Sequence, residues 1–501
     1  MAIGIKIFIM KKLSITGLAI ILLAMVGCKK ELTTEAVGLT TLEQANTTPT
    51  LSSVENSVTS SYQLLSERLN ILAQWDWGGG LVFQNDYVMQ DIASDDMEKK
   101  WNPDGDQPWM DDINNFTFTS TNGGPNGLWK YDYEGIKRLN IAIELLTRAD
   151  IETLTGITKA RKDQLLGEAY FLRSYYYFSL VTNFGDVPLI VTPVKTYQEA
   201  FEVAVRADKT IVWEKIKTDL VLAKALMPGT KFSSDTEKWR VSKGAVIALQ
   251  AKAALYTQQW PEVITLVSEL EALNFYSLNS NYFSSFNTEF TDNEVIFAYD
   301  HEKDQTPRKG NGICAPLDWG FFAPSTDFLN AFEPNDPRKL YTVDAANKNV
   351  NKMLGSLNGV NKGNDDAPNN KIYIRLADVL LWKAEAYNET GDYSGAVDII
   401  NQIRARARNS VDITGTVPPA GTLPDRAAST DKDTIKGWLI SERRVELGFE
   451  NQRMLDLKRW GIAKAVMTAN GKNFQDKHML YPIPQSEIDA SAGTLTQNPG
   501  Y

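Results

Sequence analysis

Residues 375–407 read RLADVLLWKAEAYNETGDYSGAVDIINQIRARA and contain two periodic stretches separated by a short turn. Small and aromatic side chains fall at the spacing of a tetratricopeptide repeat, in which two antiparallel helices interlock. The residues at these positions are Ala384, Tyr387, Gly391, Tyr393 and Ala396. We therefore expect one helix over about 374–388 and a second over about 394–408, packed against each other.

Helical periodicity continues toward the N-terminus. Apolar residues that recur at three- and four-residue steps share one helix face. Such a stripe is formed by Leu165, Ala169, Leu172, Tyr176 and Leu180. Ala245, Ala248, Ala251 and Leu255 form another, whose small side chains let a neighbouring helix approach closely. Residues 251–263 look like a degenerate repeat, and 129–146 with 164–180 form a further candidate pair. The sequence predicts a mainly α fold of tetratricopeptide-like helix pairs, an α-α superhelix.

Three long stretches lack this periodicity and interrupt the helical blocks. Residues 71–127 are rich in Trp, Gly, Asp and Asn, residues 274–370 mix short strand-like runs with Pro and Gly, and residues 410–432 are a polar loop. Long irregular insertions on a helical scaffold are common places for binding surfaces. We expect residues 51–501 to form a single domain in which these insertions build a second lobe.

The N-terminal segment has the pattern of an exported protein. A basic region at residues 10–12 precedes an apolar run over 13–26 that is too short to span a bilayer. The run ends at Cys28 after a small residue, which resembles the lipobox of bacterial lipoproteins. We expect residues 1–27 to be a signal peptide, Cys28 to carry lipid, and the polar residues 28–50 to be a flexible tether. The alternative is an ordinary secretory signal with an incidental cysteine.

Composition excludes several functional classes. The chain has 52 basic and 62 acidic residues, and its formal net charge of -10 repels nucleic acid. Its cysteines are Cys28 and Cys314, and its histidines are His301 and His478. These are too few for a disulfide framework or a Cys/His zinc site, and neither histidine lies in a triad-like setting. We expect no cofactor, no metal and no nucleic-acid partner.

Two groups of carboxylates invite a chemical interpretation. Glu442, Glu446, Glu450 and Asp456 could be the paired acids of a glycosidase. Arginines alternate with them at three- and four-residue steps, so on a continuous helix they form one ion-paired stripe without catalytic residues. Residues 102–106 faintly resemble a calcium loop, but Gln107 stands where the turn glycine should be.

Five tryptophans lie in the irregular insertions, where no periodicity demands burial. They are Trp75, Trp77, Trp101, Trp109 and Trp319. A sugar ring stacks its C–H face on an aromatic ring while its hydroxyls need polar partners nearby. Asn102, Asp104 and Asp318 are close in sequence to two of these rings. We expect these residues to form the ligand site, with Trp101 and Trp319 as its main pair. The alternative for each tryptophan is that it only pins its loop to the body.

Five blocks of the chain resemble one known family and follow that family's order. They read GEAYFLRSYYYFSLVTNFGDVPLI (167–190), WRVSKGAVIALQAKAALY (239–256), the repeat at 375–407, ERRVELGFENQRMLDLKRWG (442–461), and the terminal YPIPQSEI with QNPGY. These blocks resemble SusD/RagB proteins, which are nutrient-binding lipoproteins of the outer membrane. The resemblance spans nearly the whole mature chain.

The resemblance implies a helical fold with an irregular lobe that carries the ligand site. It further implies a non-enzymatic, lipid-anchored protein on the cell surface of the outer membrane, which binds an oligosaccharide or polysaccharide. The implied partner is a SusC-like TonB-dependent transporter. Two alternatives stay open, namely a RagB-like protein that captures peptides and a surface glycoside hydrolase.

Overall fold

The computed structural model describes residues 47–501, except for 73, 102–103, 233, 235, 288–291, 306–307, 358 and 412–413. The expected signal peptide, the lipidated Cys28 and most of the tether over 28–50 therefore lie outside the described residues. The chain divides into two compact units, Met1–Ser53 and Val54–Tyr501, and the fold described below is that of the second. None of the described helices is both long enough and apolar enough to cross a bilayer.

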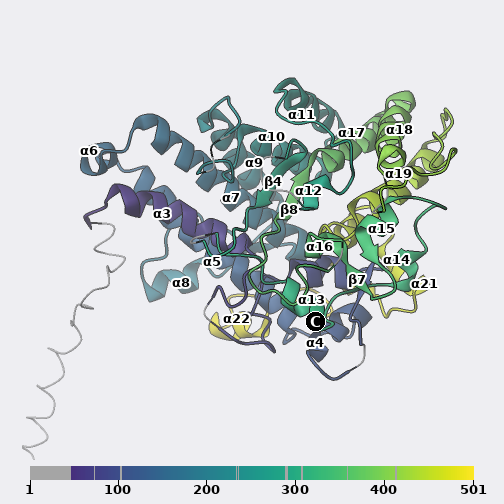
Figure 1. The fold of residues 1–501 in the computed structure, drawn as a ribbon. Helices are drawn as coiled ribbons and strands as arrows, with labels where there is room; N and C mark the ends of the chain where they lie inside the picture. Colours follow the sequence, from purple (N-terminus) through teal and green to yellow (C-terminus); the bar gives the residue numbers. More distant parts are fainter. Residues whose placement is uncertain are drawn as a thin grey trace, which may run out of the picture. The chain divides into compact units, whose positions relative to one another are not determined.

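Long helices pack on one another in the N-terminal half of this unit (Figure 1). The helices of this half are α3 (Leu51–Tyr62), α5 (Gly123–Leu146), α6 (Ile151–Thr155), α7 (Lys159–Phe184), α8 (Tyr197–Val203) and α9 (Lys209–Leu226). The long helix α7 packs against both α5 and α9. Asn122 caps α5 by accepting from the N–H of Gly124, and Thr158 caps α7 by accepting from the N–H of Arg161.

Two more of the predicted repeat pairs lie in the remainder of the unit. The long and C-terminal helices there are α10 (Lys243–Tyr256), α11 (Trp260–Ala272), α17 (Leu376–Thr390), α18 (Tyr393–Asn409), α19 (Lys432–Leu447), α20 (Arg453–Arg459), α21 (Ala463–Ala469) and α22 (Gln485–Ala490). α10 packs on α11, α17 packs on α18, and α11 also contacts α17, so these helices lie side by side in Figure 1. Gly391 ends α17 with a φ of 89°, which a side chain would strain. The predicted mainly α, tetratricopeptide-like fold is confirmed.

Short elements fill the stretches between the long helices. They are η1 (Gln63–Leu65), the π-helical turn η2 (Val88–Ile92), β1 (Met97–Glu98), α4 (Pro108–Asn115), β2 (Val187–Pro188), β3 (Arg206–Ala207), α12 (Ser284–Asn287), β4 (Val295–Tyr299), α13 (Cys314–Asp318), β5 (Ala323–Pro324), α14 (Thr326–Leu329), α15 (Arg338–Thr342), β6 (Val343–Asp344), β7 (Asn349–Val350), α16 (Asn351–Leu354), β8 (Lys371–Arg375) and η3 (Asp476–Met479). The named strands form antiparallel pairs, and the pair β1–β5 joins two insertions that are far apart in sequence.

A buried network of charges ties the second long insertion to the helices. Arg375, at the end of β8, donates to carboxylate oxygens of Glu294, Glu446 and Glu450 at 2.8, 2.7 and 2.7 Å. Burial alone would raise the pKa of Glu446, but the guanidinium groups of Arg406 and Arg375 outweigh burial and hold this pKa well below its usual range. These carboxylates are therefore structural ions.

The predicted carboxylates Glu442, Glu446, Glu450 and Asp456 are each paired with an arginine, which confirms that part of the prediction. The expectation of one continuous helix is wrong. α19 ends at Leu447, and α20 begins at Arg453. Between them, Phe449 and Asn451 have φ values of 61° and 60°, which no α-helix accommodates. The partners of Glu446 consequently come from β8, α18 and α15 and not from the next turn of its own helix.

Candidate functional site

Three of the predicted tryptophans converge with one phenylalanine on a single patch. The ring centroid of Trp77 lies 5.9 Å from that of Trp319 and 5.7 Å from that of Phe321. Trp101 lies against Gly320, next to these rings. We call Trp77, Trp101, Trp319 and Phe321 the aromatic shelf. Trp101 is 58 % exposed and Trp319 is 48 % exposed, whereas the other two rings are more buried and support them.

Gly320 joins the two exposed tryptophans, because Trp101 packs against it and Trp319 precedes it in the chain. Its carbonyl accepts a hydrogen bond of 2.8 Å from the N–H of Lys100, beside the pairing of β1 with β5. A Cβ on Gly320 would stand 2.6 Å from Cδ1 of Trp101, and the backbone there has a φ of 91°. Glycine alone meets both conditions without strain. The contact between the two halves of the shelf therefore depends on this residue.

Charged side chains line the rim of the shelf. The ammonium of Lys100 lies 5.1 Å from the ring centroid of Trp101. Asp318 and Lys362 form an ion pair of 3.2 Å, and both side chains are partly exposed. Partial burial lowers the pKa of Lys100, and the neighbouring Lys362 lowers it further. The rim thus offers polar groups of both signs to a ligand that stacks on the rings.

A buried lysine anchors the loop that carries Trp101. The side chain of Lys99 has no exposed surface, and its Nζ donates to Asp104 at 2.9 Å, to Asp111 at 3.0 Å and to the carbonyl of Asp106. Burial alone would lower the pKa of Lys99, but these hydrogen bonds outweigh burial and raise it. The same contact lowers the pKa of Asp104. Hydrogen bonds to the buried ammonium of Lys99 therefore hold together the loop that includes Asp104, Asp106 and Asp111.

A polar depression of about 520 Å³ adjoins the shelf. It lies between residue 78, residues 105–109 and residues 117–123. The polar side chains around it include Asp106, Asp112, Thr117, Thr119, Thr121 and Asn122. Trp77 belongs to the shelf and the next residue, Gly78, lines the depression, so the two surfaces are neighbours. Trp109 forms part of the wall and is only 7 % exposed.

Two family models match the chain on either side of residues 256–334. The model described as starch-binding associating with outer membrane matches residues 45–255, and the model described as SusD family matches residues 335–501. The chain belongs to the SusD family. The two matches include the loops of residues 75–109 and the arginine network, and they leave the segment with Trp319 between them.

This SusD-family chain is similar to curated proteins of Formosa agariphila. SusD-like protein P2 is 25 % identical over 546 residues, which cover 98 % of this chain and 100 % of the relative. SusD-like protein P38 is 26 % identical over 435 residues, which cover 76 % of this chain and 81 % of the relative. The similarity to P2 extends over nearly the whole chain.

Solved structures share the fold of this SusD-family chain. Surface glycan-binding protein A from Bacteroides fluxus matches with a TM-score of 0.72 and 23 % identity, over 90 % of this chain and 100 % of that one. Surface glycan-binding protein A from Bacteroides thetaiotaomicron, in complex with laminarihexaose, matches with a TM-score of 0.70 and 23 % identity, over 90 % and 99 % of the two chains. At this identity the likeness establishes the fold.

The SusD family consists of non-catalytic binding proteins, which confirms the prediction that this chain is not an enzyme. Burial lowers the pKa of His301 to about 3 and that of His478 to about 4. Each accepts a hydrogen bond from a backbone N–H, that of Glu67 and that of Gln475. Across the described residues, no group of three or more His, Cys, Asp or Glu side chains is arranged to hold a metal ion.

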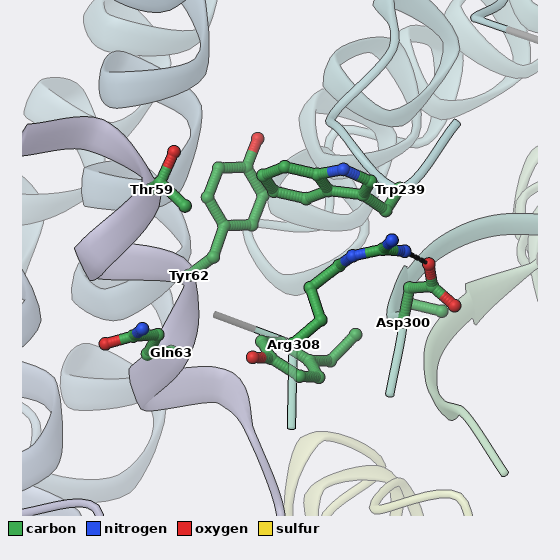
Figure 2. A pocket seen from close by; sticks show the side chains of 8 residues that line it. Thr59, Tyr62, Gln63, Trp239, Asp300 and Arg308 are labelled. Carbon is green, nitrogen blue, oxygen red and sulfur yellow. Dashed lines mark hydrogen bonds and ion pairs between the residues drawn. The ribbon is translucent and has the colours of Figure 1, made fainter. Parts of the chain in front are cut away.

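Another cavity of this SusD-family chain is too small for a sugar (Figure 2). It measures about 10 Å³, which suits at most one water molecule. Arg308 reaches across it to pair with Asp300, and its guanidinium carbon lies 5.8 Å from the ring centroid of Trp239. Tyr62 meets the ring of Trp239 edge-on at 5.2 Å. These contacts join the end of α3 to the turn before α10 and to residues 300 and 308, and the shelf remains the candidate site.

The other predicted site residues are placed in different ways. Trp75 is 62 % exposed, and Asn102 lies outside the described residues. Trp109 is buried because Pro108 starts α4, which places Trp109, Met110 and Ile113 on the side that faces the core. Contact of any predicted site residue with a ligand stays a prediction.

Sequence reasoning missed several residues that shape the site. Phe321 supports the shelf, Gly320 lets its halves meet, and Lys99 holds the loop beneath it. The glycine directly after Trp319 was the only local signal. The lysine gave none, because its partners follow it in a loop of no recognisable pattern.

Proposed function

We propose that this protein binds an oligosaccharide or polysaccharide at the cell surface and delivers it to a SusC-like TonB-dependent transporter. The packing of Trp101 against Gly320, the residue next to Trp319, with both indoles about half exposed, is the observation that carries the proposal. Exposing an apolar indole face to water is unfavourable in free energy, and the C–H face of a sugar can cover it. Polar groups of Lys100, Asp318 and Lys362 on the rim can bind the hydroxyls.

Related proteins support a sugar as the ligand. One structural neighbour is titled a laminarin-binding SusD-like protein, and another was solved in complex with laminarihexaose. The model that matches residues 45–255 is described as starch-binding. These relatives bind uncharged glucans, and we extend the class of ligand, but not its identity, to this chain.

Alanine at both exposed rings tests the stacking role. The parent and the double variant Trp101→Ala, Trp319→Ala are passed over immobilised laminarin, starch, a polyuronate and a peptide mixture. We expect the parent to be retained by at least one glycan and the double variant to bind it more weakly by roughly 2–4 kcal/mol. Helical content and the melting temperature should change little.

Tyr197→Ala is the matched control, because Tyr197 is an exposed aromatic residue on α8, outside the shelf. It should bind as the parent does. Retention of the parent by peptides alone would replace the sugar with a peptide ligand, as in RagB-like capture. Unchanged glycan binding by the double variant would place the site elsewhere.

The anchor is tested separately. Cys28 is proposed to carry a diacylglyceryl group, since two acyl chains are what stable membrane attachment requires. Cys28→Ala should release the protein from the outer membrane or trap its precursor. A processed variant that stays in the outer membrane and is cut by protease on intact cells would contradict the lipid anchor.

The transporter is proposed because a binding protein cannot move a nutrient inward by itself. The description of the matching family, associating with outer membrane, supports this location. Extraction in mild detergents should recover the protein together with a large outer-membrane barrel. Recovery as a free monomer under several mild conditions would count against the pairing.

A further inference from the structure

The polar depression beside the aromatic shelf has the chemistry of a binding site that the stacking rings do not explain. Its volume of about 520 Å³ lies within the range of roughly 300–1,000 Å³ that is typical of small-molecule sites. No lysine or arginine is among the residues that line it, whereas two carboxylates and three threonine hydroxyls are. The depression thus differs from the rim, which also carries the ammonium groups of Lys100 and Lys362.

The hydrogen bonds among the residues that line the depression leave some of their oxygen acceptors unused. The hydroxyl of Thr117 donates to one oxygen of Asp112 at 2.7 Å, and the side-chain amide of Gln107 donates to one oxygen of Asp106 at 3.1 Å. Each carboxylate keeps a second oxygen for a ligand. The amide of Asn122 is already used, since it donates to the carbonyl of Trp109 and accepts from the backbone.

The hydroxyls of Thr119 and Thr121 bond to each other at 3.0 Å, and the hydroxyl oxygen of Thr119 also accepts from the N–H of Thr121 at 3.5 Å, so the hydroxyl of Thr121 keeps a lone pair for a ligand. A group rich in O–H donors would therefore satisfy the lining. An anionic group would meet two carboxylates with no cation among the lining residues, which is unfavourable at short range.

The walls of the depression are fixed before any ligand arrives. One amide nitrogen, Nδ2 of Asn85, lies 3.0 Å from the carbonyl oxygen of Gly80 and 3.1 Å from that of Gly123, and so ties two of the walls together. A Cβ on Gly123 would stand 2.4 Å from the carbonyl oxygen of Gly78, so these walls are in backbone contact. Lys99 holds the third wall through the carbonyl of Asp106. Walls fixed in this way reduce the ordering entropy that binding must overcome.

We propose that the polar depression is a second sugar subsite, which receives an uncharged, hydroxyl-rich residue of the chain whose neighbouring residue stacks on the shelf. This rests on the proposed function, because the shelf must hold the same ligand. Trp77 and Gly78 are consecutive residues, so the depression begins one residue along the chain from the shelf, within reach of a glycan of several residues. The ligand is then a chain and not a single sugar.

The test compares short and long ligands. Laminarihexaose, maltohexaose and a polyuronate hexamer are titrated into the parent, together with the matching disaccharides. The double variant Thr119→Val, Thr121→Val removes two hydroxyls of the depression at constant shape. We expect it to lose roughly 5-fold to 10-fold in affinity for a neutral hexasaccharide and to bind the disaccharide as the parent does.

Thr414→Val, Thr416→Val is the matched control, because this exposed pair makes the same hydroxyl contact, at 2.8 Å, in the 410–432 loop. It should leave both affinities unchanged. A second variant, Asp106→Asn, alters an exposed side chain and should improve binding of the polyuronate hexamer relative to the neutral ones.

Three results would overturn the proposal. In the first, the double variant at Thr119 and Thr121 binds the neutral hexasaccharide as tightly as the parent does. In the second, this variant loses the same affinity for the disaccharide as for the hexasaccharide. In the third, the parent binds only the polyuronate. A parent that binds none of these glycans, nor any of the immobilised ones, would instead remove the proposed function itself. The melting temperature of each variant shows whether it is folded.

Discussion

The helix pairs and the loops of the shelf are held together by different forces. α10 meets its neighbours through small side chains, and Ala245, Ala248 and Ala251 on this helix are fully buried. The shelf loop is held by Lys99, whose ammonium is bound by three oxygen atoms. The second insertion is held by Arg375, which binds three carboxylates.

The difference teaches where the structure is vulnerable. In the helix pairs, each apolar contact contributes little to the free energy of unfolding, and many contacts contribute together. In the loops, a few charges bind many partners, so the loss of one leaves several buried groups unpaired. Single substitutions at the charged anchors should therefore lower stability more than single substitutions at most of the contacts between helices.

The largest effect is expected at Arg375. Replacement by methionine leaves Glu294, Glu446 and Glu450 buried with fewer cations, and breaking a buried pair in this way costs about 3–5 kcal/mol. Urea unfolding followed by circular dichroism measures the loss. Arg408→Met is the control, because Arg408 pairs with an exposed carboxylate and should lose less than about 1 kcal/mol. Equal losses in the two variants would remove the distinction between buried and surface pairs.

A buried lysine whose ammonium faces the ring of Tyr481, 4.1 Å from the centroid, and no hydrogen-bond acceptor among the described residues sharpens the comparison. Within the described part of the chain, Nζ of Lys458 on α20 has no hydrogen-bond partner, and burial lowers the pKa of Lys458 from 10.5 to about 7. The unfolded chain then binds more protons than the folded one between about pH 7 and pH 10.5, so stability rises with pH across this window.

Lys458→Met should remove this dependence and raise the free energy of unfolding by roughly 2–4 kcal/mol at pH 6. The advantage should shrink as the pH approaches 10. Urea unfolding at several pH values gives both curves. Lys464→Met, at an exposed lysine, should show neither effect. A variant that is no more stable than the parent at pH 6 would mean that this ammonium is solvated or paired in solution.

Lys99 should show an intermediate effect that is concentrated at the site. Lys99→Met leaves Asp104 and Asp111 without their cation, for a loss of roughly 1–3 kcal/mol in stability. Glycan affinity should fall as well, because the loop that carries Trp101 loses its anchor. Lys100→Met, at the next residue, should keep stability within about 0.5 kcal/mol. Unchanged binding by Lys99→Met would show that the shelf does not depend on this ion cluster.

The smallest effect is expected where helices pack. A Cβ on Gly135 of α5 would stand 2.4 Å from the ring of Tyr176 on α7, whose hydroxyl donates to the carbonyl of Ser61. Gly135→Ala gains about 1 kcal/mol of helix propensity but overfills this contact, for a net loss of roughly 1–2 kcal/mol. Gly437→Ala on α19 has open space around the new methyl group and should be stabilised instead. The melting temperatures of both variants show whether tight packing or helix propensity determines the effect of the added methyl group.

The helix pairs could be predicted from sequence because their signal is local. The spacing from Ala384 to Ala396 fixes two helices and the turn between them within one short stretch. The helix α4 was not predicted, because it is brief and lies in a segment rich in Gly and Asp. Its presence explains why Trp109 is buried although its surroundings gave no helical period.

The site could be predicted only in part. The composition of the insertions indicated Trp101 and Trp319, and both are exposed. Their convergence through Gly320 could not be deduced, because it depends on two insertions that meet through the pairing of β1 with β5. Contacts between residues far apart in the chain have no local pattern. The same reason hid the partners of Arg375.

The step from Trp77 to Gly78 has a thermodynamic consequence for a chain ligand. Two weak subsites that meet at the step from Trp77 to Gly78 would act as a chelate, since a glycan held by the rings would present its next residue to the depression at an effective concentration of order millimolar. Neither subsite then needs high affinity alone. Residence time would come from avidity along the polymer, while each sugar could still leave its subsite quickly, which the proposed delivery to a transporter requires.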